Sequence, residues 1–362
     1  MSGLTILSGA CHPLYCFEVG FQIDLDAAER AQEGSERAAL QHRERPAGPF
    51  EMRPAPLRVT EPLDGVTLPF SLGGSVEIVL YDFGAASVSY TIPLDPDPGK
   101  LLDLSVSLRG QGGLAADARR RIERLVERLG AAVHRPRVAQ LMEDYFVFEI
   151  TEWDGPADAA SLVGGHGELL ARVLRAETGD LSLEEIADAI EARISFGRRE
   201  VTLVDWDSAV IVDERPADLR AVLEYANVQL LELRHLDDNL DELVERSYQL
   251  VGRRTGWRAV WPSFLAEELR SLSTMQVESA VLLERVTNAL KFLGEEYLAR
   301  LYRLGADRLH LGEWAGSIGR KLETVDDIYK TMSTRAAGRR MELLEWVIIL
   351  LIASEMAVAL LR

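Results

Sequence analysis

The feature that most constrains the fold is a run of regularly spaced positions between residues 262 and 297. Successive positions lie four and three residues apart in alternation for nine steps. The average of 3.5 residues is typical of a helix that packs along its whole length against another helix. The positions are Leu265, Leu269, Leu272, Gln276, Ser279, Leu283, Val286, Leu290, Leu293 and Tyr297. The spacing predicts a long helix with a coiled-coil seam.

A second helical pattern, from Trp314 to Ala336, follows a stretch bounded by Gly305 and Gly312 that can turn the chain. Two long helices joined by a short turn predict an antiparallel hairpin over 262–340, about 60 Å long if each helix has about forty residues. We expect self-association along the seam of this hairpin. The alternative is a compact bundle whose core contains the same stripes. The central seam residues are Leu269, Leu272, Leu283, Val286, Leu290 and Leu293.

The first 214 residues mix strand and helix patterns. Hairpin-like strand pairs in mixed order favour an α+β fold over a doubly wound sheet. The expected strands are 15–23, 76–81, 86–92, 144–151, 200–205 and 208–213, and the expected helices cover 114–130 and 161–192, with a capping box at Ser182 and Glu185. A short exposed helix and a polar, proline-rich linker occupy 24–56. The predicted domains are therefore an α+β domain, 1–214, and a helical domain, 215–362.

Composition narrows the classes of partner and compartment. The net charge of −18 opposes contact with phosphate backbones, so we expect no general nucleic-acid binding. Two cysteines, Cys11 and Cys16, are too few for a disulfide-stapled secreted fold, and the N-terminus has no signal-peptide pattern. With His12 they form a Cys/His cluster, but the second ligand pair that zinc normally requires is missing.

Candidate catalytic groups are few. Asp205 and Asp207 flank Trp206 on a predicted strand, where alternate residues share a face, so a carboxylate pair for acid–base or metal chemistry is conceivable. Solvent-facing strand positions explain the pair more simply. His166, between two glycines, is the histidine most worth testing. The chain lacks the phosphate-loop, calcium-loop and nucleophile-elbow motifs. We therefore assign no catalytic residue, no metal ligand and no cofactor.

The C-terminal segment 343–361 is strongly apolar. Its length is close to the roughly twenty residues that cross a bilayer, but Glu355 lies inside it, where a charge costs about 3 kcal/mol. The flanks favour a membrane anchor with the body on the cytoplasmic side. The anchor residues are Trp346, Ile348, Ile349, Leu350, Leu351 and Glu355, and the basic flank is Arg335, Arg339 and Arg340. The alternative is a cytoplasmic homo-oligomer that buries this helix.

Three stretches resemble a known family. They are KLETVDDIYKTMSTRAAGRRMELLEWVIILLIASE at 321–355, EYANVQLLELRHLDDNLD at 224–241 and YDFGAASVSY at 81–90. They are similar to the required-for-meiotic-nuclear-division family, also called the YagE family, a domain of unknown function. The resemblance is good over about the last 150 residues and thin before them. It implies a membrane-associated, largely non-enzymatic protein, and supplies no catalytic residues.

These observations predict a membrane-tethered, self-associating scaffold or adaptor, whose protein partner the sequence does not identify. The main alternative is an enzyme or small-ligand-binding protein with a pocket near Asp205, Asp207 and His166. A deep pocket where these groups converge would favour the alternative.

The seam generates a prediction. Replacing both Leu283 and Leu290 with lysine places charges where apolar side chains are expected to meet a partner helix, so it should dissociate an oligomer or collapse the hairpin. Light scattering and thermal melting measure the two outcomes. Unchanged mass together with unchanged melting would show that the seam assignment is wrong.

Overall fold

The computed structural model describes residues 4–32, 36–37, 54–64, 70–110, 112–252, 262–288 and 296–360. The chain divides into two compact units. The first comprises Met1–His235 and Arg285–Glu313, and the second comprises Leu236–Glu284 and Trp314–Arg362. The first unit thus runs beyond residue 214 and includes a later helical segment.

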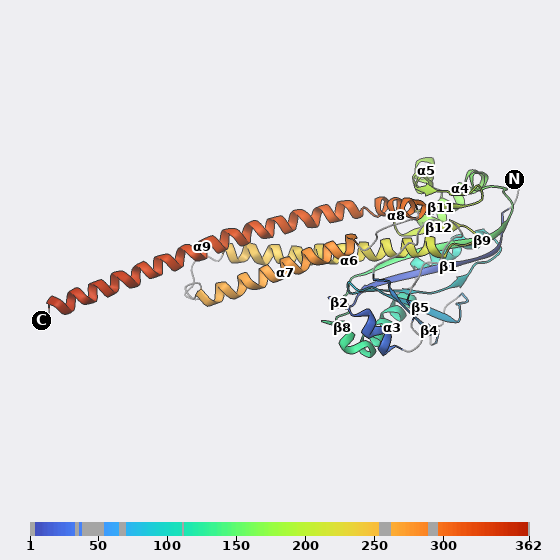
Figure 1. Cartoon of the computed structure of the whole chain (residues 1–362). Coiled ribbons are helices and arrows are strands. Elements are labelled where there is room, and N and C mark those ends of the chain that lie inside the picture. The colour runs from blue at the N-terminus through green and yellow to red at the C-terminus, as the bar shows by residue number, and fades with distance from the viewer. Residues whose placement is uncertain are drawn as a thin grey trace. The chain divides into compact units, whose positions relative to one another are not determined.

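The first unit is built on a mixed sheet. Ten described strands pair in the order β10-β11-β12-β9-β1-β6-β5-β4-β3, with β7 paired to β1. Neighbours are antiparallel except β9 and β12, which are parallel. The strands are β1 (Thr5–Glu18), β3 (Glu36–Arg37), β4 (Leu57–Pro62), β5 (Ser75–Leu80), β6 (Ala85–Ser89), β7 (Ile92–Pro93), β9 (Met142–Asp154), β10 (Arg193–Ile194), β11 (Val201–Val204) and β12 (Ser208–Val212). Figure 1 shows β1 and β9 side by side in this sheet.

One face of the sheet carries the main hydrophobic core. Alternate residues of β1, such as Tyr15 and Phe17, point to this face and join a cluster that includes Ile122 and Leu125. The elements before the sixth helix are α1 (Leu25–Ala31), α2 (Gly99–Arg109), α3 (Gly112–Leu129), the 3-10 helix η1 (Gly130–Ala132), α4 (Ala159–Arg175) and α5 (Leu183–Glu191). A two-stranded ladder of β2 (Gln22–Ile23) and β8 (Val133–His134) lies outside the main sheet.

The opposite face of the sheet is covered by the first part of α6 (Ala217–Gly252). Here the intervening β1 residues meet polar groups of the helix. The Arg220 guanidinium donates to Glu149 at 2.9 Å, and the Asn227 amide donates to the Cys16 sulfur at 3.3 Å. Helix α8 (Glu296–Arg308) adds a bond from the Tyr302 hydroxyl to α6. The face of the sheet under α6 therefore combines polar contacts with buried apolar residues such as Leu14 and Val147.

The α+β class is confirmed, and several local predictions hold. The hairpin expected at 76–92 is the antiparallel pair β5–β6, and the helix expected at 114–130 is α3. The hydroxyl of Ser182 caps α5 by accepting from the Glu185 amide at 3.1 Å. The strand expected at 15–23 is different, because β1 begins at Thr5 and ends at Glu18. Pairing with β9 extends this strand over glycine, alanine and proline residues that have low strand propensity.

The second unit is helical, as predicted for the C-terminal region. It contains the rest of α6, most of α7 (Pro262–Asn288) and most of α9 (Leu311–Leu360). Within it the Lys321 ammonium pairs with Asp237 at 2.8 Å and with Asp241 at 2.6 Å, which joins α9 to α6. The Gln276 amide donates to Asp326 at 3.4 Å and joins α7 to α9.

The seam positions are only partly described. Leu272 and Val286 are buried, and Leu283 is half-buried. The side chain of Leu269 and the whole of Leu290 and Leu293 lie outside the described residues. On α9 the residues Ile318, Val325 and Met332, seven apart, are buried.

The predicted membrane anchor is corrected. Over the residues that the structure describes, no helix combines the length and the apolar character needed to cross a bilayer. The unbroken run of large apolar residues covers only Trp346–Ile352 in the last third of α9, well short of the roughly twenty that a crossing requires. The basic flank, Arg335, Arg339 and Arg340, belongs to the same helix, and its side chains lie outside the described residues, as does that of Glu355.

The turn between β5 and β6 generates a prediction. Gly84 has φ of +99°, and a Cβ there would lie 1.8 Å from the carbonyl oxygen of Gly20. Replacing Gly84 with alanine should lower the free energy of unfolding by more than about 2 kcal/mol, because it adds a backbone clash to an unfavourable φ. Chemical denaturation measures the change.

The matched control is Gly74→Ala, since a Cβ at Gly74 meets nothing within 4 Å. This variant should differ from the parent by less than about 0.5 kcal/mol. Equal stabilities of the two variants would contradict the role of Gly84.

Candidate functional site

Asp205 and Asp207 lie in the tight turn that joins β11 to β12. The amide of Asp205 donates to the carbonyl of Ser208 at 2.8 Å, and the Asp205 carboxylate accepts from the amide of Trp206 at 2.8 Å. Trp206 is 56% exposed, whereas Asp205 is fully buried and Asp207 is 9% exposed. The expectation that both carboxylates face solvent is therefore wrong.

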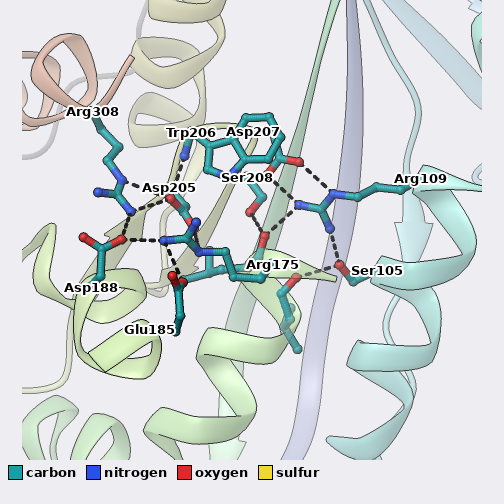
Figure 2. Close-up of polar contacts among 12 residues, drawn as sticks. Ser105, Arg109, Arg175, Glu185, Asp188, Asp205, Trp206, Asp207, Ser208 and Arg308 are labelled. Carbon is teal, nitrogen blue, oxygen red and sulfur yellow. Dashed lines mark hydrogen bonds and ion pairs between the residues drawn. The ribbon is translucent and has the colours of Figure 1, made fainter. Parts of the chain in front are cut away.

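The carboxylate of Asp205 is held by two arginines. Arg308 of α8 donates to one oxygen from Nε at 3.0 Å and from Nη2 at 2.7 Å. Arg175 of α4 forms an ion pair with the other oxygen at 2.8 Å. Both arginines also pair with Asp188 of α5, so that the turn, two helix ends and α5 form one charge network (Figure 2).

The carboxylate of Asp207 is held by a third arginine. Arg109 of α2 donates from Nε at 2.7 Å and from Nη2 at 2.5 Å to its two oxygens, which is the strong, two-pronged form of this contact. The same guanidinium donates to the hydroxyl of Ser105 and to the carbonyl of Leu174. We call Asp205, Asp207, Arg109, Arg175 and Arg308 the arginine clamp.

Each arginine of the clamp lies in the last turn of its helix. The C-terminal end of a helix carries partial negative charge from carbonyl groups that lack an intrahelical partner, and a cation there is favourable. The clamp supplies such cations and also satisfies the Leu174 carbonyl at the end of α4, through Arg109 and the Ser208 hydroxyl. The three helix ends therefore meet the two aspartates at a single turn.

Electrostatics follow this geometry. Hydrogen bonding from Arg308 lowers the pKa of Asp188 below its usual range, and the reverse effect raises the pKa of Arg308 above its usual value. Because arginines occupy both aspartates of the clamp, neither has a free oxygen pair to ligate a metal ion or to transfer a proton. The arrangement can hold elements together, but it does not form a carboxylate dyad.

His166 does not join this cluster. It is half-buried on α4, nine residues before Arg175, a separation of roughly 13 Å along the helix axis. The three groups considered for an enzyme pocket therefore do not converge. A hollow lies beside α3, away from these three groups. It is lined by Asp64, Asp117, Arg120, Glu123, Arg124 and Glu127.

Cys11 and Cys16 are both buried free thiols, and burial raises the pKa of each well above its usual value. Cys11 faces the main core, whereas Cys16 faces α6. His12 contacts Glu149 at 3.1 Å and Arg220 at 2.8 Å. Within the described ranges, no three histidine, cysteine or acidic residues are placed to hold a metal ion.

Sequence reasoning found the two aspartates of the clamp but not its arginines. The helix α2 was not predicted, so Arg109 had no assigned place. A usable signal was present: an Asp-Trp-Asp turn between two strands, together with arginines at the ends of α4 and α8. Sequence alone does not show that those ends meet.

The clamp generates a prediction. Asp205→Asn removes the buried negative charge that pairs with the guanidinium groups of Arg175 and Arg308. It should therefore lower the free energy of unfolding by about 3 kcal/mol. The control is Asp188→Asn, whose side chain is about half exposed. It should cost under about 1 kcal/mol. Denaturant titration of both variants checks this, and an Asp205→Asn protein as stable as its control would refute it.

The match to a known family concerns the first unit. Residues 8–218 match a family model described as the N-terminal domain of the uncharacterized protein MJ0711. The uncharacterized protein MJ0711 of Methanocaldococcus jannaschii is 24% identical to the chain over 224 residues, which are 61% of this chain and 67% of that protein. No solved structure matches the chain.

The resemblance to the required-for-meiotic-nuclear-division family is thereby corrected. It depended mainly on 224–241 and 321–355, which the matching family model does not cover. The family model matches more than half of the 362 residues, and the chain belongs to the MJ0711 N-terminal domain family.

Proposed function

We propose that the protein is a self-associating scaffold in which a second copy of the chain covers residues 346–357 of α9. We call these residues the tail segment. The observation that carries the proposal is the exposure of its large apolar side chains, which are between 51% and 67% exposed. They are Trp346, Val347, Ile348, Ile349, Leu350, Leu351, Ile352 and Met356.

The exposed apolar side chains lie on all sides of the helix. Seven consecutive residues advance by about 100° each and so occupy every direction around the axis. Helices that are apolar on all sides are normally buried, and large apolar patches in water usually mark sites of association. Burying a large apolar side chain is favourable by about 2 kcal/mol, and this free energy is not gained for any side chain of the stretch that stays exposed.

A helical partner suits the tail segment. Earlier on α9, the buried residues Ile318, Val325 and Met332 recur every seven positions, the spacing of helices that pack on helices. The tail segment continues the same helix. A second copy supplies an identical apolar helix, and symmetric self-association is the usual form of protein assembly. The hairpin predicted over 262–340, with its seam, would then be the arm that presents the tail segment.

The alternative of an enzyme in the first unit loses its main support. Its proposed groups were Asp205, Asp207 and His166. The two carboxylates are paired with the arginines of the clamp, and His166 lies apart from them. The scaffold proposal needs no open carboxylate.

The test compares the oligomeric mass of the full chain with that of the double variant Ile349→Glu, Ile352→Glu. The parent should show a mass of two or more chains. Loss of two apolar contacts per chain, about 3 kcal/mol, should weaken association at least about a hundredfold and shift the variant to one chain. Light scattering over a range of protein concentrations measures the shift.

The matched control is Leu183→Glu, the same kind of change at an apolar residue that is 87% exposed in the first unit. It should keep the parent's mass. A parent that stays monomeric at high concentration, or a control that dissociates like the tail variant, would contradict the proposal.

A further inference from the structure

One carboxyl group of α6 is buried in an unusual way. Glu232 is completely buried, and neither of its carboxylate oxygens has a hydrogen-bond partner. Four other polar side chains of α6 do have partners in the sheet. The pairs are Arg220 with Glu149, Glu224 with Ser87, Asn227 with Cys16 and Arg234 with Glu143. An ionised carboxylate in such a place would carry a large desolvation cost.

The acid that acts on Glu232 belongs to β1. Glu18, at the end of that strand, is largely buried, and one of its oxygens also lacks a hydrogen bond. That oxygen lies 3.7 Å from Nε2 of His235, one turn beyond Glu232 on α6. The charge of Glu18 thus acts on Glu232 in the interior, where two negative charges would repel each other.

We propose that Glu18 and Glu232 form a proton-binding pair, in which Glu232 carries a proton in the folded chain and the chain loses stability when that proton leaves. In this pair a proton offsets the buried negative charge, whereas in the arginine clamp guanidinium groups do so. It sits at the last residues of α6 that belong to the first unit, since the second unit begins at Leu236.

The charged groups around the pair support this assignment. On α6, Arg234 is engaged by Glu143 of β9, and Nε2 of His235 lies 3.7 Å from Glu18. Arg137, after β8, is exposed and lowers the pKa of Glu18 through its charge. No positive charge of this set is bonded to Glu232. The hydroxyl of Tyr225, nearby on α6, is committed to the Val286 carbonyl.

The pKa directions agree with the geometry. Burial raises the pKa of Glu18 to about 7, and burial followed by the charge of Glu18 raises the pKa of Glu232 well above its usual value. A raised pKa means that the folded chain holds protons that the unfolded chain releases. This contribution to stability is complete below the ordinary carboxyl pKa, near 4.5 for Glu18, and is lost as pH rises toward 7 and beyond.

The test measures unfolding of the full chain against pH, for the parent and for Glu232→Gln. The glutamine keeps the shape of the side chain and needs no proton. The parent's unfolding constant, divided by that of the variant, should rise by up to about tenfold per pH unit between pH 5 and 8. Glu18→Gln should behave similarly up to about pH 7.

The matched control is Asp238→Asn, the same acid-to-amide change at an exposed residue of the same helix. The parent's unfolding constant, divided by that of this control, should not change with pH. An independent readout is infrared absorption: the parent at neutral pH should show the carbonyl band of a buried protonated acid, and Glu232→Gln should lack it.

Two results would overturn the proposal. One is a ratio for Glu232→Gln that is flat with pH, with no protonated-acid band in the parent. The other is stabilisation of the parent, but not of Glu232→Gln, by added Mg²⁺ or Ca²⁺ at pH 8, which would identify a cation in place of the proton.

Discussion

The pairing of β1 with β9 is the interaction on which the first unit depends. The register runs from Thr5 opposite Asp154 to Phe17 opposite Met142 and joins segments about 140 residues apart. Because paired residues of an antiparallel ladder share a face, this register places the acids of both strands, Glu18 and Glu143 among them, beneath α6. A shift by one residue would turn those acids into the main core and the aromatic residues outward. The parallel contact of β9 with β12 then fixes where the Asp205–Asp207 turn lies.

That turn explains why the helices around it end where they do. Helices α2, α4 and α8 come from distant parts of the sequence, and each would leave carbonyl groups without partners at its C-terminus. An arginine in each last turn meets a buried aspartate, and Arg109 also donates to the Leu174 carbonyl at the end of α4. Three guanidinium groups from three helices thus meet the two aspartates in the interior. The exposed Trp206 lies at the tip of the turn that this network holds.

Local patterns predicted much of this fold. The β5–β6 hairpin, α3 and the cap of α5 depend on neighbours in the sequence, so alternation, 3.6-residue periodicity and capping residues were enough to find them. The first half of β1 and the arginine partners of Asp205 and Asp207 depend on contacts across the chain. The prediction that the two aspartates face solvent failed for the same reason: strand alternation was applied to residues that form a turn, where alternation does not hold. The apolar run at the end of α9 was visible in the sequence, but its role depends on what covers it.

The chain handles buried carboxylates in two ways, and the difference is physical. Burial raises the free energy of an ionised carboxylate, and the group either gains a cation or keeps its proton. Asp205 and Asp207 lie at a place where helix ends already favour cations, so guanidinium groups serve the helix ends and the acids together. Glu232 lies in the middle of a helix, whose carbonyls are already bonded and attract no cation. The nearest arginine on its own helix, Arg234, is engaged by Glu143. A proton is the smallest positive charge that can enter such a site, and it leaves when the solution becomes alkaline. The first unit therefore contains one site where guanidinium groups meet buried carboxylates and one where a proton takes that place.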